Sequence, residues 1–226
     1  MGSDAKLSMF DQFALVGKAL GSGKRLELLD LIAQRERTVG ELAQLAGLGI
    51  STTSAHLQVL KRARLVTTRR EETSIFYALA GDDVAALYVQ VQRVARSHIA
   101  EAERARLAYL GVSDDSDVVK VDREELLARV RSGSVVVLDV RPGDEYAAGH
   151  IPGAASIPLE QLERRLAELP ADLEVVAYCR GDNCVMALEA VRLLRANGRN
   201  AHRLDHGIVE WRVSGQPISP APHPAG

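Results

Sequence analysis

The stretch that decides the fold of the second half of the chain is Val175-Val176-Ala177-Tyr178-Cys179-Arg180-Gly181-Asp182-Asn183-Cys184. Its apolar start is typical of a strand buried on both faces, and the periodicity from Val185 to Asn197 predicts a helix. A cysteine at such a turn lies beside unpaired backbone N–H groups and the positive end of the helix, which favour a thiolate. We therefore expect Cys179 to be a nucleophile with a lowered pKa, in a loop that can hold an anion or a terminal sulfur atom.

Strands and helices alternate on both sides of this stretch. We expect strands at Val118–Val121, Val135–Val140 and Ala201–Leu204, and helices at Arg123–Ser132 and Leu159–Leu169. This alternation predicts an α/β domain with a parallel sheet flanked by helices. Its expected limits are residues 118–218, preceded by a short acidic linker at 111–117 and followed by a disordered, proline-rich tail at 219–226.

The first half, residues 1–110, has a mostly helical pattern. Within Thr38–Val66 two short helices are separated by a turn at Ala46–Gly49, the arrangement of a helix-turn-helix. The β-rich segment Leu65–Leu79 then predicts a hairpin with Arg69-Arg70 at a charged tip, and Asp82–Leu110 predicts one long helix. A helix-turn-helix followed by a hairpin is a winged helix, so the fold class is a mostly α winged helix joined to an α/β domain.

The second helix of the pair is the candidate DNA reader. We expect Ile50, Thr53, Leu57 and Leu60 to face inward. The side chains available to base edges and phosphates belong to the helix and the hairpin. The candidate DNA contacts are Ser51, Thr52, Thr53, Ala55, His56, Gln58, Arg62, Arg69 and Arg70.

Composition and charge exclude several classes of protein. The 226 residues are 46% apolar and 26% charged, too apolar for a disordered chain, and no apolar stretch approaches the roughly 20 residues of a membrane helix. The N-terminus does not read as a signal peptide, so we expect a cytoplasmic protein. Residues 1–112 carry a net charge of +3 and residues 113–226 a net charge of −5, which leaves the first half free to face a polyanion.

At Ser54-Ala55-His56-Leu57, with Leu60, Ala63, Leu65 and Val66 after it, the chain resembles the ArsR/SmtB family of bacterial repressors. The resemblance covers residues 6–110 and implies a homodimer, formed through the first and last helices, that binds an operator with an inverted repeat. Arg64 stands where the family usually has glycine, which puts the local turn in doubt. The first half has no cysteine and one histidine on its last helix, His98, so we expect no metal site there.

The second half resembles the rhodanese (sulfurtransferase) family. Three spaced motifs carry the resemblance: residues 138–158, which include Asp139, Arg141, Glu145 and His150; the loop at 179–184; and Leu204-Asp205-His206-Gly207 with Trp211, Gly215 and Pro217. The resemblance implies that Cys179 takes sulfane sulfur from thiosulfate, a persulfide or a polysulfide and passes it to a thiol or cyanide. It also assigns the residues of the first motif mainly to folding and loop support.

The other residues of the loop that is expected to hold the sulfur are Arg180, Gly181, Asp182, Asn183 and Cys184. We expect Arg180 to add positive charge at the mouth of this loop. Cys184 is either a resolving thiol for a Cys179 persulfide or a small side chain packed under the loop. We expect no cofactor and no membrane partner.

The combined interpretation is a dimeric DNA-binding repressor whose second domain senses reactive sulfur through Cys179. Two alternatives remain open. One is a constitutive sulfurtransferase that the winged helix tethers to DNA or dimerises. The other is a metalloid sensor that uses Cys179 and Cys184 as ligands.

Overall fold

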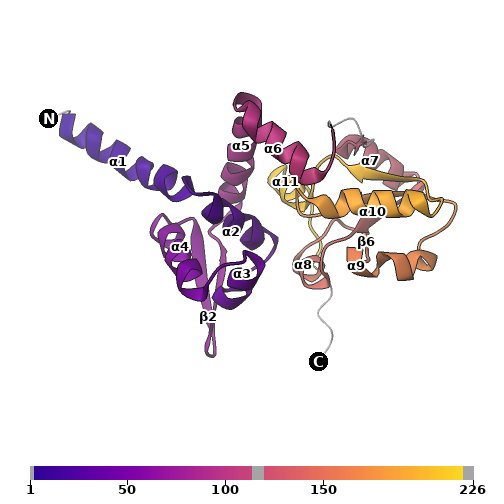
Figure 1. Ribbon diagram of the computed structural model, residues 1–226, viewed down its shortest axis with the longest axis horizontal. Helices are drawn as coiled ribbons and strands as arrows, with labels where there is room; N and C mark the ends of the chain where they lie inside the picture. The colour runs from indigo at the N-terminus through magenta and orange to yellow at the C-terminus, as the bar shows by residue number, and fades with distance from the viewer. Residues whose placement is uncertain (1–2, 114–119, 221–226) are drawn as a thin grey trace. The chain divides into compact units, whose positions relative to one another are not determined.

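The computed structural model describes residues 3–113 and 120–220 and divides the chain into two compact units, residues 1–88 and 89–226. Within the described residues no helix has the length and apolar character needed to cross a membrane. The helix α5 (Asp82–His98) begins in the first unit and ends in the second. Both predicted fold classes are confirmed, a winged helix in the first unit and a parallel sheet with helices in the second (Figure 1).

The first unit is helical with a small antiparallel sheet of order β1-β3-β2. Its elements before α5 are α1 (Ser3–Leu20), α2 (Gly23–Gln34), β1 (Arg37–Thr38), α3 (Val39–Leu45), α4 (Ile50–Arg62), β2 (Val66–Glu71) and β3 (Ser74–Leu79). Fully buried leucines from three helices, Leu28, Leu42, Leu57 and Leu60, form the centre of its core. This apolar contact fixes α4 against α2 and α3 and so determines which face of α4 is left exposed.

Local signals explain where the helices of this unit begin and turn. Thr38 and Glu41 form a capping box at the start of α3, in which each side chain binds the other's backbone N–H. Gly47 lies in the turn between α3 and α4 with a φ of +62°, a conformation that glycine adopts without steric cost. Arg64, after α4, has a φ of +57°. An arginine in this conformation is strained, which explains why the family that the first half resembles favours glycine at this turn.

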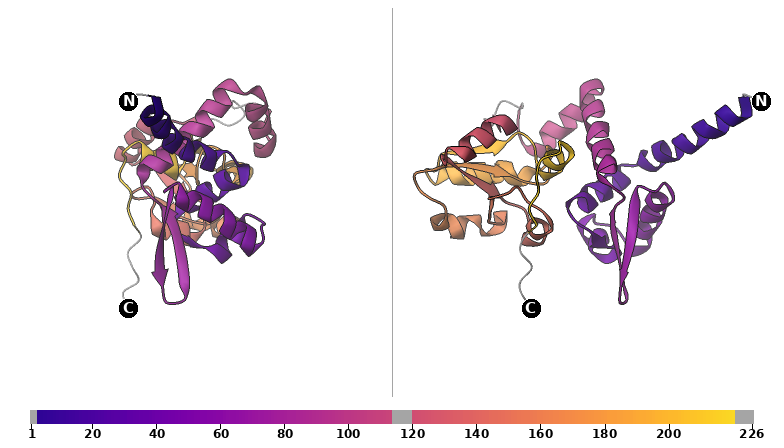
Figure 2. Two further views of the ribbon diagram at one scale, coloured as in Figure 1. Left: turned by 90° about the vertical axis from the view of Figure 1, so that its left-hand side faces the viewer. Right: turned by 180° about the vertical axis from the view of Figure 1, so that it is seen from behind.

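The second unit contains a five-stranded sheet of order β4-β8-β7-β5-β6 in which every pairing is parallel. Helices lie on both faces of the sheet (Figure 2). Its elements after α5 are α6 (Ala100–Leu110), β4 (Lys120–Val121), α7 (Arg123–Arg131), β5 (Val135–Asp139), α8 (Gly143–Ala148), β6 (Ala155–Ser156), α9 (Leu159–Leu162), a 3₁₀ helix (Glu163–Glu168), β7 (Glu174–Tyr178), α10 (Val185–Ala196), β8 (Ala201–Leu204) and α11 (Ile208–Val213). The central strand β7 is buried, as its apolar sequence predicts.

The single helix predicted over Asp82–Leu110 is wrong, because the chain breaks at Ile99. This β-branched residue is extended, with a φ of −119° and a ψ of 101°. The basic residues in the last turn of α5 and the acidic residues in the first turn of α6 complement the dipoles of two separate helix ends. The helix predicted over Leu159–Leu169 is likewise divided into α9 and the 3₁₀ helix.

Most of the predicted tail and linker, residues 221–226 and 114–117, lies outside the described residues. The start of the tail is ordered, which contradicts the prediction there. Ser219 forms an antiparallel bridge with His150 through two backbone hydrogen bonds of 2.9 Å each. Backbone pairing with His150 thus holds Ser219 in place.

Candidate functional site

The exposed face of α4 presents most of the side chains predicted to read DNA. Ser51, Thr52, Ala55, Gln58 and Arg62 are exposed. His56 is half-buried. Small polar side chains near a helix N-terminus suit close approach to base edges and phosphates. The face therefore has the composition of a recognition helix.

Two predictions about α4 are wrong. Thr53 is fully buried, and its hydroxyl donates a hydrogen bond to the Gly49 carbonyl oxygen at 3.0 Å, so it is not available to DNA. Ile50 was expected to face inward but is 63% exposed. Ile50 is the first residue of α4, and a residue at the start of a helix has packing neighbours on one side only. It therefore stays exposed although it fits the spacing of the apolar residues.

The hairpin differs from the predicted one at its tip. Arg69 and Arg70 lie within β2, and the turn is formed by Glu72 and Thr73. The Arg69 guanidinium is paired with Glu36 at 2.5 Å and with Glu71 at 2.8 Å. Hydrogen bonding to Arg69 lowers the pKa of Glu36. A phosphate would have to compete with two carboxylates for Arg69, so its positive charge is less available than the sequence predicted.

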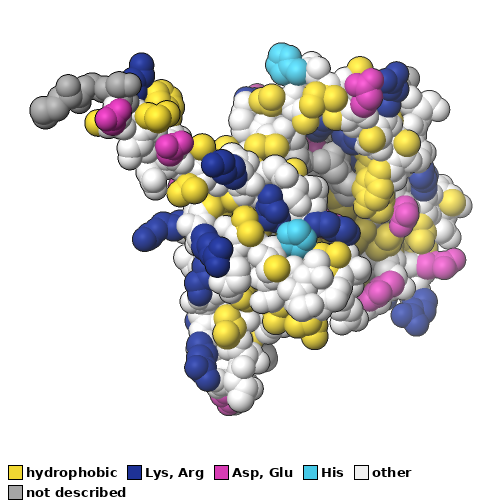
Figure 3. All heavy atoms as spheres, turned by 60° about the vertical axis from the view of Figure 1, so that its left-hand side comes forward, with side chains coloured by type: hydrophobic (Ala, Val, Ile, Leu, Met, Phe, Trp, Pro, Cys, Tyr) yellow, Lys and Arg dark blue, Asp and Glu magenta, His cyan; other side chains and the backbone are white. Residues whose placement is uncertain are grey.

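Basic side chains nevertheless follow this unit from α4 to the hairpin. Figure 3 shows Lys and Arg side chains gathered along one side of it. A groove between α4 and β2 is lined by Gln58, Lys61, Arg62, Arg64 and Thr67, among others. Three of these five side chains are cationic, so the groove adjoining the recognition helix has the charge that a nucleic-acid backbone requires.

The second candidate site is the cysteine loop, residues 179–184, between β7 and α10. The N–H groups of Ile208 and Val209 donate to the carbonyl oxygens of Cys179 and Arg180, at 3.0 and 3.2 Å. The backbone of Gly207 lies so close to the loop that a Cβ there would be 2.3 Å from the Gly181 nitrogen. The segment after β8 thus holds the loop from outside.

The pKa values of the two cysteines differ from the prediction. Cys179 is only 2% exposed, and burial raises its pKa well above the usual value. A hydrogen bond from the Cys179 thiol lowers the pKa of Cys184, which is half-buried, and the N–H groups of Arg180 and Met186 lower it further. Cys184 is at the N-cap of α10, whereas Cys179 lies in the core. The loop therefore favours a thiolate at Cys184 and a protonated thiol at Cys179.

Three of the supporting residues predicted from the first motif, Asp139, Arg141 and Glu145, take part in ion pairs. Asp139 and Arg141 are both fully buried and joined by side-chain hydrogen bonds of 2.7 to 3.1 Å. The carboxylate of Glu145 is buried and accepts two hydrogen bonds from Nε and one from Nη2 of Arg180. Arg180 is therefore neutralised by Glu145, and the positive charge expected at the mouth of the loop is reduced.

The middle of the cysteine loop faces α5. Arg96 pairs with Asp182 at 3.0 Å, and Gln92 accepts a hydrogen bond from the Asn183 side chain. Burial would raise the pKa of Asp182, but hydrogen bonds from His206 and Arg96 outweigh burial and lower it. The sequence gives no signal for these contacts, because Arg96 and Asp182 are 86 positions apart.

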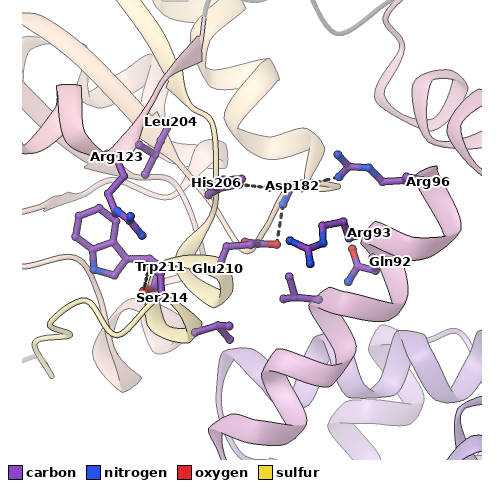
Figure 4. A pocket seen from close by; sticks show the side chains of 12 residues that line it. Gln92, Arg93, Arg96, Arg123, Asp182, Leu204, His206, Glu210, Trp211 and Ser214 are labelled. Carbon is purple, nitrogen blue, oxygen red and sulfur yellow. Dashed lines mark hydrogen bonds and ion pairs between the residues drawn. The ribbon is translucent and has the colours of Figure 1, made fainter. Parts of the chain in front are cut away.

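Glu210 closes the opposite side of the loop. Its carboxylate accepts the N–H groups of Asp182 and Gly207, at 3.3 and 3.1 Å, so the Asp182 N–H is not available to an anion inside the loop. Burial, together with the charge of Asp182, raises the pKa of Glu210 to about 7. Figure 4 shows Glu210 and His206 between α5 on one side and Arg123 and Trp211 on the other.

The raised pKa of Glu210 predicts a pH-dependent stability of the second unit. The stabilisation from a protonated Glu210 is complete below pH 4.5 and is lost as the pH rises through 7. We expect the free energy of unfolding to fall by on the order of 2 kcal/mol from this group between pH 5 and 8. Glu210→Gln should remove most of that fall. Urea unfolding followed by the fluorescence of Trp211, the single tryptophan, measures it.

The matched control is Glu160→Gln, which changes an exposed glutamate of α9 and should leave the pH profile unchanged. His206, whose pKa the hydrogen bond to Asp182 raises, contributes a change of the same sign. A smaller fall should therefore persist in Glu210→Gln. A Glu210→Gln profile identical to that of the wild type would contradict the prediction.

In the part of the chain that the structure describes, no three His, Cys, Asp or Glu side chains are grouped so that they could hold a metal ion.

Comparisons with known proteins match both halves. The model of the bacterial regulatory protein arsR family matches residues 22–68, and that of the rhodanese-like domain matches residues 122–214. The HTH-type transcriptional regulator Rv0324 of Mycobacterium tuberculosis is 50% identical over 216 residues, 96% of this chain and 94% of that protein. A protein named sulfurtransferase from Allochromatium vinosum is 33% identical over 102 residues, 45% of this chain and 94% of that protein.

Among solved structures, the homodimeric winged helix-turn-helix DNA-binding domain of Mb0332 from Mycobacterium bovis is 49% identical. The match covers 44% of this chain and 92% of that domain, with a TM-score of 0.41. The near full-length relative and the two family matches agree with the two folds described above. The chain belongs to the ArsR family of bacterial regulatory proteins, and it is a transcriptional regulator in which a rhodanese-like domain follows the winged helix.

Proposed function

We propose that this regulator is a repressor whose affinity for its operator changes when its two cysteines take up sulfane sulfur. The observation that carries the proposal is the pairing of α5 with the middle of the cysteine loop, through Arg96–Asp182 and Gln92–Asn183. Sulfur transferred onto Cys179 would alter the loop residues that follow it, to which α5 is held. Since α5 begins in the first unit, where Tyr88 donates to Asp30 at 3.0 Å, a change at the loop reaches that unit through one helix.

The chemistry begins at Cys184, whose thiolate is favoured and whose side chain is the more exposed of the two. The thiolate attacks the terminal sulfur of a persulfide donor, RS–SH. A bond forms between Cys184 Sγ and that sulfur, the RS–SH bond breaks, and its electron pair leaves on RS⁻. Cys184 then carries a persulfide, and the donor is released as a thiolate.

Transfer to Cys179 completes the loading. The Cys179 sulfur attacks the outer sulfur of the Cys184 persulfide, and the proton of the Cys179 thiol passes to the departing Cys184 sulfur. The products are a Cys179 persulfide and a Cys184 thiol. Burial of Cys179 protects the persulfide from solvent, which suits a signal that must persist while DNA binding changes. A thiol acceptor reverses the sequence and resets the protein.

The DNA side of the proposal rests on the exposed face of α4. We place the DNA-binding and dimerisation domain at residues 1–110 and assign operator contacts to Ser51, Thr52, Ala55, Gln58 and Arg62. Exposed apolar side chains of α1, Leu7, Phe10 and Phe13, support burial against a second copy. A homodimer places two recognition helices on an inverted repeat, one half-site per subunit.

The test is operator affinity in the reduced and the polysulfide-treated protein. Operator DNA is first selected from a random duplex library with the reduced full-length chain, and affinity is then measured by fluorescence anisotropy at fixed salt. We expect polysulfide to change the affinity at least tenfold, which corresponds to about 1.4 kcal/mol of coupling. Mass spectrometry of the same samples reports which cysteine carries sulfur.

Three variants separate uptake from response. Cys179→Ser and Cys184→Ser should bind the selected DNA but not respond to polysulfide. Arg96→Gln should load sulfur yet lose most of the response, because it removes the ion pair with Asp182. The control Arg104→Gln removes an exposed pair with Glu101 on α6 and should respond normally. Wild-type protein that carries sulfur but binds DNA with unchanged affinity would refute the sensing proposal.

A second candidate function is constitutive sulfur transfer. It is favoured by the similarity of the rhodanese-like half to the Allochromatium vinosum protein that is named sulfurtransferase. In that case the same samples would show steady turnover of thiosulfate to a thiol acceptor, and polysulfide would leave DNA affinity unchanged. Here the winged helix would serve only to tether or dimerise the enzyme.

A further inference from the structure

We propose that a cavity beside the cysteine loop binds a small organic dianion with two carboxylate ends and a short apolar middle. The cavity has a volume of about 290 Å³ and is lined by residues of α5, α7, α11, β8, the loop residue Asp182 and His206 (Figure 4). Its size is at the lower end of the range for small-molecule sites. It is larger than an inorganic anion needs, so the occupant has an organic body.

Positive charge in the cavity is not balanced by the acidic groups that line it. Arg93, Arg96 and Arg123 all line the cavity. Asp182 is occupied by Arg96 and His206, and Glu210 accepts backbone N–H groups.

Over residues 3–113 and 120–220, Arg93 and Arg123 have neither an ion pair nor a hydrogen bond from their side chains. Two guanidinium groups are therefore left to bind anions. Each can form a bidentate pair with one carboxylate.

The two arginines come from different elements, and an apolar wall accompanies them. Arg93 projects from α5, while Arg123 lies on the other side of the cavity near the Trp211 indole (Figure 4). Leu204 and Val89 add further apolar surface. A ligand that contacts both arginines must pass this wall, which favours a hydrocarbon or aromatic link between its two charged ends.

This site goes beyond the sulfur chemistry of the loop. No cysteine lines the cavity, so an occupant does not need a sulfur atom to bind. The occupant would instead adjoin the Arg96–Asp182 ion pair, and a second small-molecule signal would thereby reach the same contact between α5 and the loop.

Adipate is the probe, in a titration of the full-length protein at constant ionic strength. Trp211 reports binding, because it is the only tryptophan and it lines the cavity. Calorimetry provides a second readout. We expect saturable binding at least tenfold tighter than that of hexanoate, which has one carboxylate, and no binding of 1,6-hexanediol, which has none. Dicarboxylates from succinate to suberate should show one preferred length.

Variants locate the site. Arg93→Gln and Arg123→Gln should each weaken adipate binding at least tenfold, whereas Arg131→Gln, at the exposed end of α7, should not. Cys179→Ser should bind adipate as the wild type does, so the outcome is independent of the proposed sulfur sensing. The inference is overturned if no dicarboxylate of the series binds saturably, if hexanoate binds as tightly as adipate, or if both glutamine variants keep wild-type affinity.

Discussion

Replacing Arg141 with methionine is expected to lower the free energy of unfolding of the second unit by about 3 to 5 kcal/mol. The guanidinium is fully buried, holds the buried carboxylate of Asp139, and donates to the Gly149 carbonyl oxygen at 2.7 Å. Methionine fills a similar volume but leaves the carboxylate buried without a cation. Such a charge costs far more than the lost hydrogen bonds. Urea unfolding followed by Trp211 fluorescence measures the loss.

The comparison variant is Arg165→Met, which removes an exposed pair with Glu168 and should cost less than about 1 kcal/mol. A second substitution tests the cause. In the background of Arg141→Met, Asp139→Asn removes the stranded charge and should restore part of the lost stability. A cost for Arg141→Met no larger than that for Arg165→Met would show that the buried pair does not support the sheet as argued.

Gly207→Ala should disable the cysteine loop while sparing the winged helix. The added Cβ would lie 2.3 to 2.6 Å from backbone atoms of Gly181 and Arg180, and backbone cannot move aside as a flexible side chain can. Relieving the overlap separates the loop from Ile208 and Val209, whose N–H groups hold it. We expect a loss of about 1 to 3 kcal/mol in unfolding free energy and an at least tenfold fall in sulfur uptake, read by mass spectrometry.

Gly143→Ala is the matched glycine control, since a Cβ there meets nothing within 4 Å. It should load sulfur as the wild type does. Reduced Gly207→Ala should still bind the selected operator DNA, because its winged helix is intact, but its affinity should no longer respond to polysulfide. Wild-type sulfur uptake by Gly207→Ala would mean that the contact with Gly181 does not hold the loop in its working form.

The sequence was sufficient for the folds because both depend on patterns local in the chain. The apolar run of β7 predicts a buried strand, and the spacing of Leu57 and Leu60 predicts the inner face of α4. The same spacing failed for Ile50 and did not separate α5 from α6 at Ile99. In these cases the number of packing neighbours and the charges at helix ends decide the outcome, and periodicity measures neither.

The candidate site was predictable in its residues but not in its electrostatics. The order strand, cysteine, helix predicts a stabilised thiolate, yet it does not say which of two cysteines is buried. The structure favours Cys184. Arg69 and Arg180 were expected to offer free positive charge, and each is paired with a glutamate that lies more than 30 positions away. Such pairings depend on tertiary structure, so no spacing rule reveals them.

The shared helix α5 has a consequence for how proteins of this architecture diverge. Tyr88 of α5 bonds Asp30 in the first unit, and Arg96, two turns further along, bonds Asp182 in the second. One helix therefore carries a specific contact of each unit. A recombination event that brought in a foreign rhodanese-like half would have to supply an acidic partner for Arg96, so we expect substitutions at Arg96 and Asp182 to occur together.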